Sequence, residues 1–317
     1  MSIRAFWELV EGPTKLASVL PFCVGTLFAA VVLGQVNWVN STLFFVAMLL
    51  FDMTTTAINN WMDYRKAKDD QYRQTVNVIG RRQLPTALVR AVIWGMLAVS
   101  TALSLVLVWR TDWLLLLAGG ACFVVGIFYT FGPLPLSRMP LGELFSGVVM
   151  GLGIPGIAAY VAARTTPFLR LTFAWPNLAL AGDWPALVAL AFVCVTPMAT
   201  IANVMLANNM SDLAEDTANK RMTLPMYLGP AHSRLLYTLL AYGGYVAVVL
   251  AVAVGLLPWP TLVALLTLPW AMRNTNRFRH RQDKRLTFKT SLYNLLLENG
   301  GLIAGLLLSL LVKGGVR

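Results

Sequence analysis

The residues best suited to chemistry lie in the stretch NNMSDLAEDTANKRMTLPMYLG, which begins at Asn208. Asn208, Asp212 and Asp216 are four residues apart, so in a helix their side chains lie one above another on one face. Two carboxylates and a carboxamide offer hard oxygen ligands, which favour Mg²⁺ over zinc. Lys220 and Arg221 follow directly. The stretch therefore predicts a site that holds a divalent cation together with an anionic phosphate.

An earlier stretch, INNWMDYRKAKDDQ, begins at Ile58 and has the same parts in the same order. We call it the first acidic stretch, and we call the one that begins at Asn208 the second acidic stretch. Asn59 and Asp63 are again four residues apart, and Lys68 and Asp69 come one to two turns later. Both stretches follow an apolar run, although they lie in different halves of the chain. This recurrence indicates one site built from two acidic stretches rather than two solvated helix ends.

Further polar residues lie near these stretches. Asp52 stands inside an apolar run, seven residues before Asn59 and so on nearly the same helical face. An acid inside a membrane span indicates a functional site. Arg138, in the segment between two apolar runs, either orients the chain or binds a substrate carboxylate. The basic run 273–289 is interpreted as a contact with anionic lipid.

The composition is that of a membrane protein. Hydrophobic residues make up 57% of the 317 residues, charged residues make up 12%, and the mean hydropathy is +0.67. The charged fraction is about half that of an ordinary soluble domain. The net charge of +11 lies in a few connecting segments, which is a topology signal and argues against a nucleic-acid partner. The three cysteines lie inside apolar runs, where no disulfide framework is expected.

Apolar runs of about 20 residues predict nine transmembrane helices in an all-α bundle, as a single domain of residues 1–317. The predicted spans are residues 14–34, 40–60, 86–109, 112–131, 142–163, 185–207, 234–256, 259–273 and 291–312. Basic residues fall mainly in alternate connections. The positive-inside rule then places the N-terminus and both acidic stretches on the cytoplasmic side of the cell membrane.

At these residues the chain resembles the UbiA-type intramembrane prenyltransferase superfamily, whose members carry two Asp-rich loops on a bundle of nine helices. Within it, the second acidic stretch is similar to the branch that prenylates 1,4-dihydroxy-2-naphthoate in menaquinone synthesis. FYTFGPLPLSRMPLGELFSG (128–147) and TKLASVLPFCVGT (14–26) resemble segments of the same branch. Two residues depart from the pattern. Asn60 stands where the family usually has Asp, and Ser211 stands where Arg often precedes the Asp.

The resemblance implies that a polyprenyl diphosphate ionises against Mg²⁺ and that the naphthoate ring attacks it. Diphosphate and carbon dioxide leave, and demethylmenaquinone is the product. The implied metal ligands are Asn59, Asp63, Asp69, Asn208, Asp212 and Asp216, of which Asp63, Asp212 and Asp216 are the catalytic carboxylates. The expected diphosphate-binding residues are Lys68, Lys220 and Arg221. As a separate hypothesis from the residues themselves, Asp52, Tyr129 and Arg138 line a cavity for the aromatic acceptor. Membrane lipid surrounds the prenyl tail.

Two alternatives remain at this point. A related prenyltransferase that acts on 4-hydroxybenzoate, homogentisate or haem would carry the same Asp-rich loops. A cation-coupled transporter also carries acids in a bundle of spans, but it would place them near the bilayer midplane. Most of the acids in this sequence lie at the ends of spans beside Lys and Arg, which favours the enzyme.

Overall fold

Long apolar runs form the helices of this protein, because a backbone in an apolar environment satisfies its own hydrogen bonds as a helix. The computed structural model describes residues 1–67, 70–130, 139–165, 167–218 and 221–314. The N-terminal half contains α1 (Ile3–Leu9), η1 (Gly12–Lys15), α2 (Leu16–Phe28), η2 (Ala29–Leu33), α3 (Trp38–Lys66), η3 (Tyr72–Val76), α4 (Val78–Arg81), α5 (Thr86–Arg110) and α6 (Trp113–Thr130). The C-terminal half contains α7 (Gly142–Val148), η5 (Val149–Gly153), α8 (Ile154–Ala162), β1 (Leu169–Ala174), β2 (Asn177–Gly182), α9 (Trp184–Ser211), α10 (Leu213–Ala218), α11 (Leu224–Ala253), η6 (Trp259–Thr267), α12 (Leu268–His280) and α13 (Lys289–Gly314).

Seven helical segments of the described chain are long and apolar enough to cross a membrane. They are Gly12–Leu33, Trp38–Arg65, Thr86–Arg110, Gly142–Ala162, Trp184–Ser211, Leu224–Ala253 and Lys289–Val312. These segments coincide with seven of the predicted spans. The predicted span 112–131 falls on the shorter apolar helix α6, and 259–273 falls on η6 and the first turns of α12. Pro269 is the second residue of α12, and its missing backbone donor favours a break between η6 and α12. The total of nine spans and the cytoplasmic N-terminus stay predictions.

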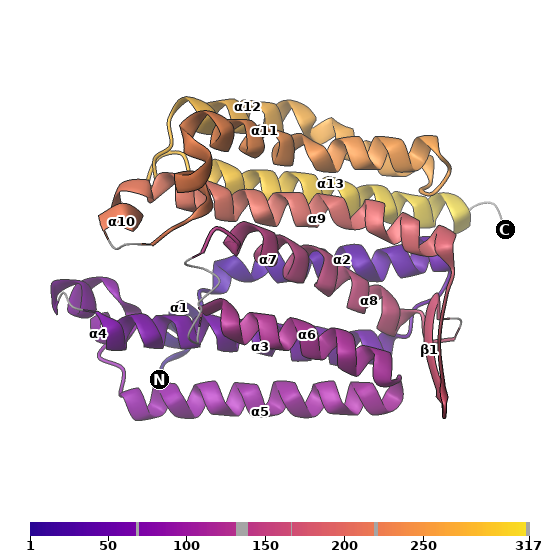
Figure 1. Cartoon of the computed structure of the whole chain (residues 1–317), viewed down its shortest axis with the longest axis horizontal. Coiled ribbons are helices and arrows are strands. Elements are labelled where there is room, and N and C mark those ends of the chain that lie inside the picture. Colours follow the sequence, from indigo (N-terminus) through magenta and orange to yellow (C-terminus); the bar gives the residue numbers. More distant parts are fainter. Residues whose placement is uncertain (68–69, 131–138, 166, 219–220, 315–317) are drawn as a thin grey trace.

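The helices lie side by side, and α9 contacts α7, α11 and α13 (Figure 1). Glycine permits the closest approaches. A Cβ atom on Gly151 would lie 2.3 Å from the Cα of Met198, and one on Gly25 would lie 2.2 Å from the Pro155 carbonyl oxygen. Small residues at helix contacts are typical of membrane bundles, because they let backbones approach. They hold η5 against α9 and α2 against α8.

The two helices that carry the acidic stretches begin at capped residues. The side chain of Asn37 accepts a hydrogen bond from the Asn40 amide at 3.0 Å, and the side chain of Asp183 accepts one from the Ala186 amide at 3.2 Å. Both caps lie at the end of the bundle that carries β1 and β2 (Figure 1). The C-terminal ends of α3 and α9, with the acidic stretches, therefore both lie at the opposite end of the bundle.

The segment between α8 and α9 forms a β-hairpin, which departs from the all-α prediction. β1 and β2 are antiparallel, with Leu171 opposite Leu180 and Phe173 opposite Leu178. Side chains alternate along a strand, so these four residues share one face. Phe173, Leu178 and Leu180 are 68%, 67% and 65% exposed. The hairpin lies across the end of the bundle (Figure 1) and presents an apolar face that the described protein leaves uncovered.

We expect this apolar face to lie in the lipid interface. A nitroxide on Leu180→Cys, with the three native cysteines replaced by alanine, should collide with dissolved oxygen more often than with a water-soluble nickel chelate. Ala179→Cys is the matched control, because neighbouring strand positions point to opposite faces, and it should show the reverse. Power-saturation EPR in liposomes measures both. Equal access of the nickel chelate to the two positions would contradict the prediction.

Candidate functional site

The second acidic stretch lies where α9 ends. The Asp212 amide donates to the Asn208 carbonyl at 3.0 Å, and the Asp216 amide donates to the Asp212 carbonyl at 2.8 Å. The helical spacing therefore continues from α9 into α10 and keeps the three residues one turn apart. An acid at the C-terminal end of a helix is opposed by the helix dipole. Asp212 thus does not stabilise α9 through its charge.

Asp216 is the buried member of this stretch, with 2% of its surface exposed. Its Oδ1 lies 3.2 Å from Nη1 of Arg221, and the Arg221 amide donates to the Asp216 carbonyl at 2.9 Å. Burial raises the pKa of the Asp216 carboxyl, the Arg221 guanidinium partly offsets this, and the Asp212 charge raises it further. Arg221 therefore contacts the acidic stretch directly. Lys220 lies outside the described residues.

The first acidic stretch forms the last turns of α3. Asn59 and Asp63 are one turn apart on this helix and both are partly exposed. The Ala67 amide donates to the Asp63 carbonyl at 2.9 Å, where the helix ends. This end of α3 lies at the same end of the bundle as α10 (Figure 1). Lys68 and Asp69, which were predicted to belong to the site, lie outside the described residues.

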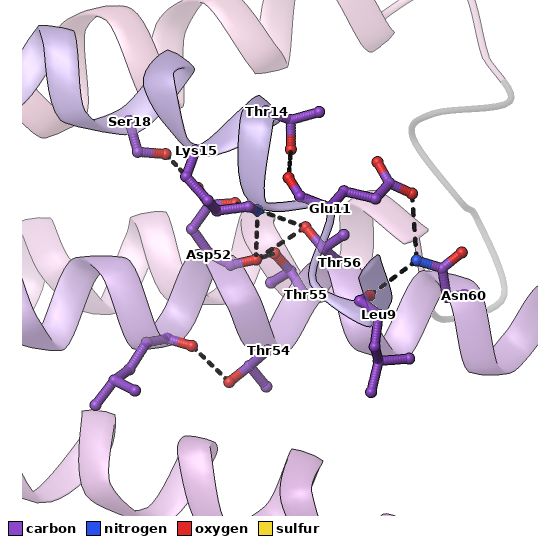
Figure 2. Close-up of polar contacts among 11 residues, drawn as sticks. Leu9, Glu11, Thr14, Lys15, Ser18, Asp52, Thr54, Thr55, Thr56 and Asn60 are labelled. Atoms are coloured by element: carbon purple, nitrogen blue, oxygen red, sulfur yellow. Dashed lines mark hydrogen bonds and ion pairs between the residues drawn. The ribbon is translucent and has the colours of Figure 1, made fainter. Parts of the chain in front are cut away.

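Asn60, where the superfamily usually has Asp, joins α3 to the N-terminal segment. Its Nδ2 donates to the Leu9 carbonyl at 3.0 Å and to Oε1 of Glu11 at 3.2 Å (Figure 2). The backbone carbonyl of Asn60 accepts a hydrogen bond from Nδ2 of Asn77 at 2.9 Å. An ionised carboxylate has no hydrogen to donate, so Asp could make neither side-chain contact. The departure at position 60 therefore has a structural reason.

A cavity of about 330 Å³ joins the first acidic stretch to the apolar interior. Asp52 and Asn59 of α3 and Tyr129 of α6, all singled out from the sequence, contribute to its wall. Its aromatic wall consists of Phe44, Phe51, Phe123 and Phe145. Thr54 of the same helix is fully buried, and its hydroxyl donates to the Leu50 carbonyl. Arg138 lies outside the described residues.

Asp52 is paired with Lys15, the last residue of η1. Nζ of Lys15 lies 2.6 Å from Oδ1 of Asp52 and donates to Oγ1 of Thr56 at 2.8 Å (Figure 2). Ser18 donates its hydroxyl to the other Asp52 oxygen. The Lys15 and Asp52 side chains are only 6% and 17% exposed. Sequence reasoning missed Lys15, although an acid inside a span signals that a counter-charge is needed.

Glu143 is a second residue that sequence reasoning did not single out. Nδ2 of Asn209 donates to Oε1 of Glu143 at 2.8 Å, and both side chains are buried. Among the residues that the structure describes, Oε2 of Glu143 has no hydrogen-bond partner. The pair joins the start of α7 to the last turn of α9, next to Asn208. It therefore helps to fix the orientation of the second acidic stretch.

The ammonium group of Lys284 contacts two of the predicted metal ligands. Nζ of Lys284, in the loop between α12 and α13, donates to Oδ2 of Asp212 at 2.5 Å and also to Oδ1 of Asn208. Oxygen atoms that attract a cation in this way are also suitable ligands for Mg²⁺. Over the described ranges, no group of three or more His, Cys, Asp or Glu side chains could hold a metal alone. Mg²⁺ would complete its shell with water and substrate phosphate, as it commonly does.

The chain matches the UbiA prenyltransferase family over residues 18–296. It is 29% identical over 282 residues to 1,4-dihydroxy-2-naphthoate octaprenyltransferase of Mycobacterium leprae (strain TN), a match that covers 86% of this chain and 85% of the relative. The apo structure of a UbiA homologue from Aeropyrum pernix K1 is similar, with a TM-score of 0.67, 16% identity and coverage of 91% of this chain and 97% of that chain. A UbiA homologue from Archaeoglobus fulgidus bound to DMAPP and Mg²⁺ gives a TM-score of 0.64 at 12% identity, with coverage of 97% and 99%. Both structures share the helical bundle of this chain.

Proposed function

Because the chain belongs to the UbiA prenyltransferase family, we propose that it transfers a polyprenyl group from polyprenyl diphosphate to 1,4-dihydroxy-2-naphthoate in menaquinone synthesis. The observation that carries the proposal is the cavity that runs from Asn59, in the first acidic stretch, to Asp52 inside the bundle. It offers one space in which a phosphate group near the acids and an aromatic ring among the spans can meet. The name of the Mycobacterium leprae relative supports the acceptor. The seven candidate spans and the family make this an integral membrane protein.

The leaving group is the part of the reaction that the acidic stretches serve. Asn208, Asp212 and Asp216, together with Asn59, Asp63 and Asp69, would hold Mg²⁺, which supplies positive charge to the departing diphosphate. Arg221, held against Asp216, would add a fixed positive charge, and Lys68 and Lys220 would add others. We place both stretches on the cytoplasmic side of the cell membrane.

The cavity serves the carbon chemistry. The allylic C–O bond breaks and its electron pair leaves with the diphosphate, while the ring carbon that bears the carboxylate forms the new C–C bond. That carboxylate then leaves as carbon dioxide, and its bonding electrons restore the aromatic ring. The immediate product is therefore the hydroquinone, demethylmenaquinol, and demethylmenaquinone forms from it by a separate two-electron oxidation. The phenylalanines of the wall exclude water, which would otherwise capture the allylic cation. Asp52 would accept a hydrogen bond from an acceptor hydroxyl and Tyr129 would pack beside the ring.

The test is an assay of the protein in liposomes with Mg²⁺, a polyprenyl diphosphate and 1,4-dihydroxy-2-naphthoate. Prenylated product followed by mass spectrometry and trapped carbon dioxide should appear in equal amounts, and both should vanish with EDTA. Prenylation of 4-hydroxybenzoate or homogentisate in its place would keep the prenyltransferase and overturn the acceptor. Transfer to none of these acceptors would overturn the proposed function.

A further inference from the structure

We propose that Lys284 is a diphosphate-binding residue, supplied to the site by the loop between α12 and α13. The ligand class rests on the proposed function, whereas the contact itself rests on geometry. Nζ of Lys284 lies 2.5 Å from Oδ2 of Asp212 and also donates to Asn208, so it bridges two oxygens of the second acidic stretch. The basic run that carries Lys284 was interpreted from the sequence as a lipid contact. This member of the run points into the site.

The loop that carries Lys284 is fixed by its own hydrogen bonds. One oxygen of the Asp283 side chain accepts the amides of Arg285 and Leu286, each at 2.9 Å. The Thr287 hydroxyl donates to the Arg281 carbonyl at 2.7 Å and accepts the Asp283 amide at 3.0 Å. The hydrogen bond from the Leu286 amide, together with that from the Arg285 amide, holds the pKa of the Asp283 carboxyl below its usual range, although partial burial opposes this. A carboxylate that stays ionised keeps this turn closed, and Lys284 projects from it.

The base of the loop is anchored in the bundle. Phe288 packs against the buried cluster of Leu206, Ala207, Tyr237 and Phe278, which joins the last turns of α9 and α12 to the middle of α11. Nζ of Lys284 lies 5.1 Å from the centroid of the Phe288 ring. The aromatic ring therefore supports the lysine from one side while Asp212 and Asn208 attract it from the other. A basic segment that only contacted lipid headgroups would not require a turn with this many internal hydrogen bonds and a packed aromatic anchor.

A lysine at this position has two successive partners. Before substrate arrives, its ammonium offsets the charge of Asp212. With Mg²⁺ bound at those oxygens, the ammonium would be displaced from Asp212 but would stay within reach of the site, because the lysine stem is flexible and its charge is compact. A diphosphate bound at the same Mg²⁺ would then be a new anionic partner for it. Lys284 thus competes with the metal in the free protein and binds the phosphate in the loaded site.

The experiment measures binding rather than turnover. In detergent-solubilised full-length protein, Lys284→Met should increase the affinity for Mn²⁺ severalfold in the absence of diphosphate, as followed by EPR. With Mg²⁺ present, the same variant should bind inorganic diphosphate about tenfold more weakly in calorimetry, the loss expected for one charge-assisted contact. Lys284→Arg should keep most of the diphosphate affinity. Arg285→Met is the matched control, since it removes an equal charge from the exposed neighbouring side chain.

Unchanged diphosphate affinity in Lys284→Met would overturn the proposal. An equal loss in Arg285→Met would also overturn it, because bulk positive charge would then explain the effect. Thermal unfolding of each variant checks that the half-exposed position tolerates the change. If diphosphate binding depends on Lys284 but no acceptor is prenylated, the binding role stands and the proposed function fails. The two failures are therefore distinguishable.

Discussion

Asp212→Ala is expected to lower prenyl transfer by at least about a hundredfold, because charge stabilisation of a leaving group is worth that much in other sites. The variant loses a carboxylate that lies one turn from Asn208 and one turn from Asp216. It should fold normally, since an acid at the C-terminal end of α9 is opposed by the helix dipole by about 0.3–1 kcal/mol. Removing it also breaks the Lys284 ion pair, which is partly exposed and so contributes little.

The same helix offers the control. Asp183 caps the other end of α9, where its side chain accepts the Ala186 amide. Asp183→Ala should lower stability by about 1 kcal/mol through loss of the cap and leave prenyl transfer within about twofold. Initial rates in liposomes and thermal unfolding in detergent measure the two properties. An Asp212→Ala protein that retains its activity would remove Asp212 from the metal site.

Local features of the site could be predicted from the sequence because they depend on neighbouring residues. The four-residue spacing of Asn208, Asp212 and Asp216 leads to one turn between them, and the backbone bonds across the end of α9 preserve it. The long helices follow from apolar length, as α3 and α9 show. Asp52 and Tyr129 were expected at one cavity, and both line it. Their predicted roles stay predictions.

Contacts between distant segments could not be predicted in this way. Lys284 and Asp212 are 72 residues apart, and Lys15 and Asp52 are 37 apart. A basic residue beside an apolar run is ordinarily interpreted as a topology signal. A lysine that contacts the site cannot be told apart from such a residue by sequence alone. The β-hairpin was missed for another reason, since its strands are short and their alternation is weaker than the apolar runs on either side. Lys15 alone had a signal, because an intramembrane acid calls for a counter-charge.

Lys15→Met is expected to lower the free energy of unfolding by about 3–5 kcal/mol, the cost of leaving a buried charge without its partner. The variant keeps the length of the side chain but leaves the Asp52 carboxylate, which is 17% exposed, with the Ser18 hydroxyl and without its counter-charge. The thermal unfolding midpoint in detergent measures the loss. Lys15→Met combined with Asp52→Leu should recover most of the stability, because a buried ion pair replaced by apolar groups is often neutral or stabilising.

The double variant also separates stability from acceptor binding. If Asp52 accepts a hydrogen bond from the acceptor, the double variant should unfold near the wild-type temperature and yet have a raised KM for 1,4-dihydroxy-2-naphthoate. Its KM for the polyprenyl diphosphate should be unchanged, because the acidic stretches at the end of the bundle are intact. If the stable double variant had the wild-type KM for the acceptor, the Lys15–Asp52 pair would have a structural role only. The acceptor would then have to bind elsewhere along the cavity that joins Asn59 to the interior of the bundle.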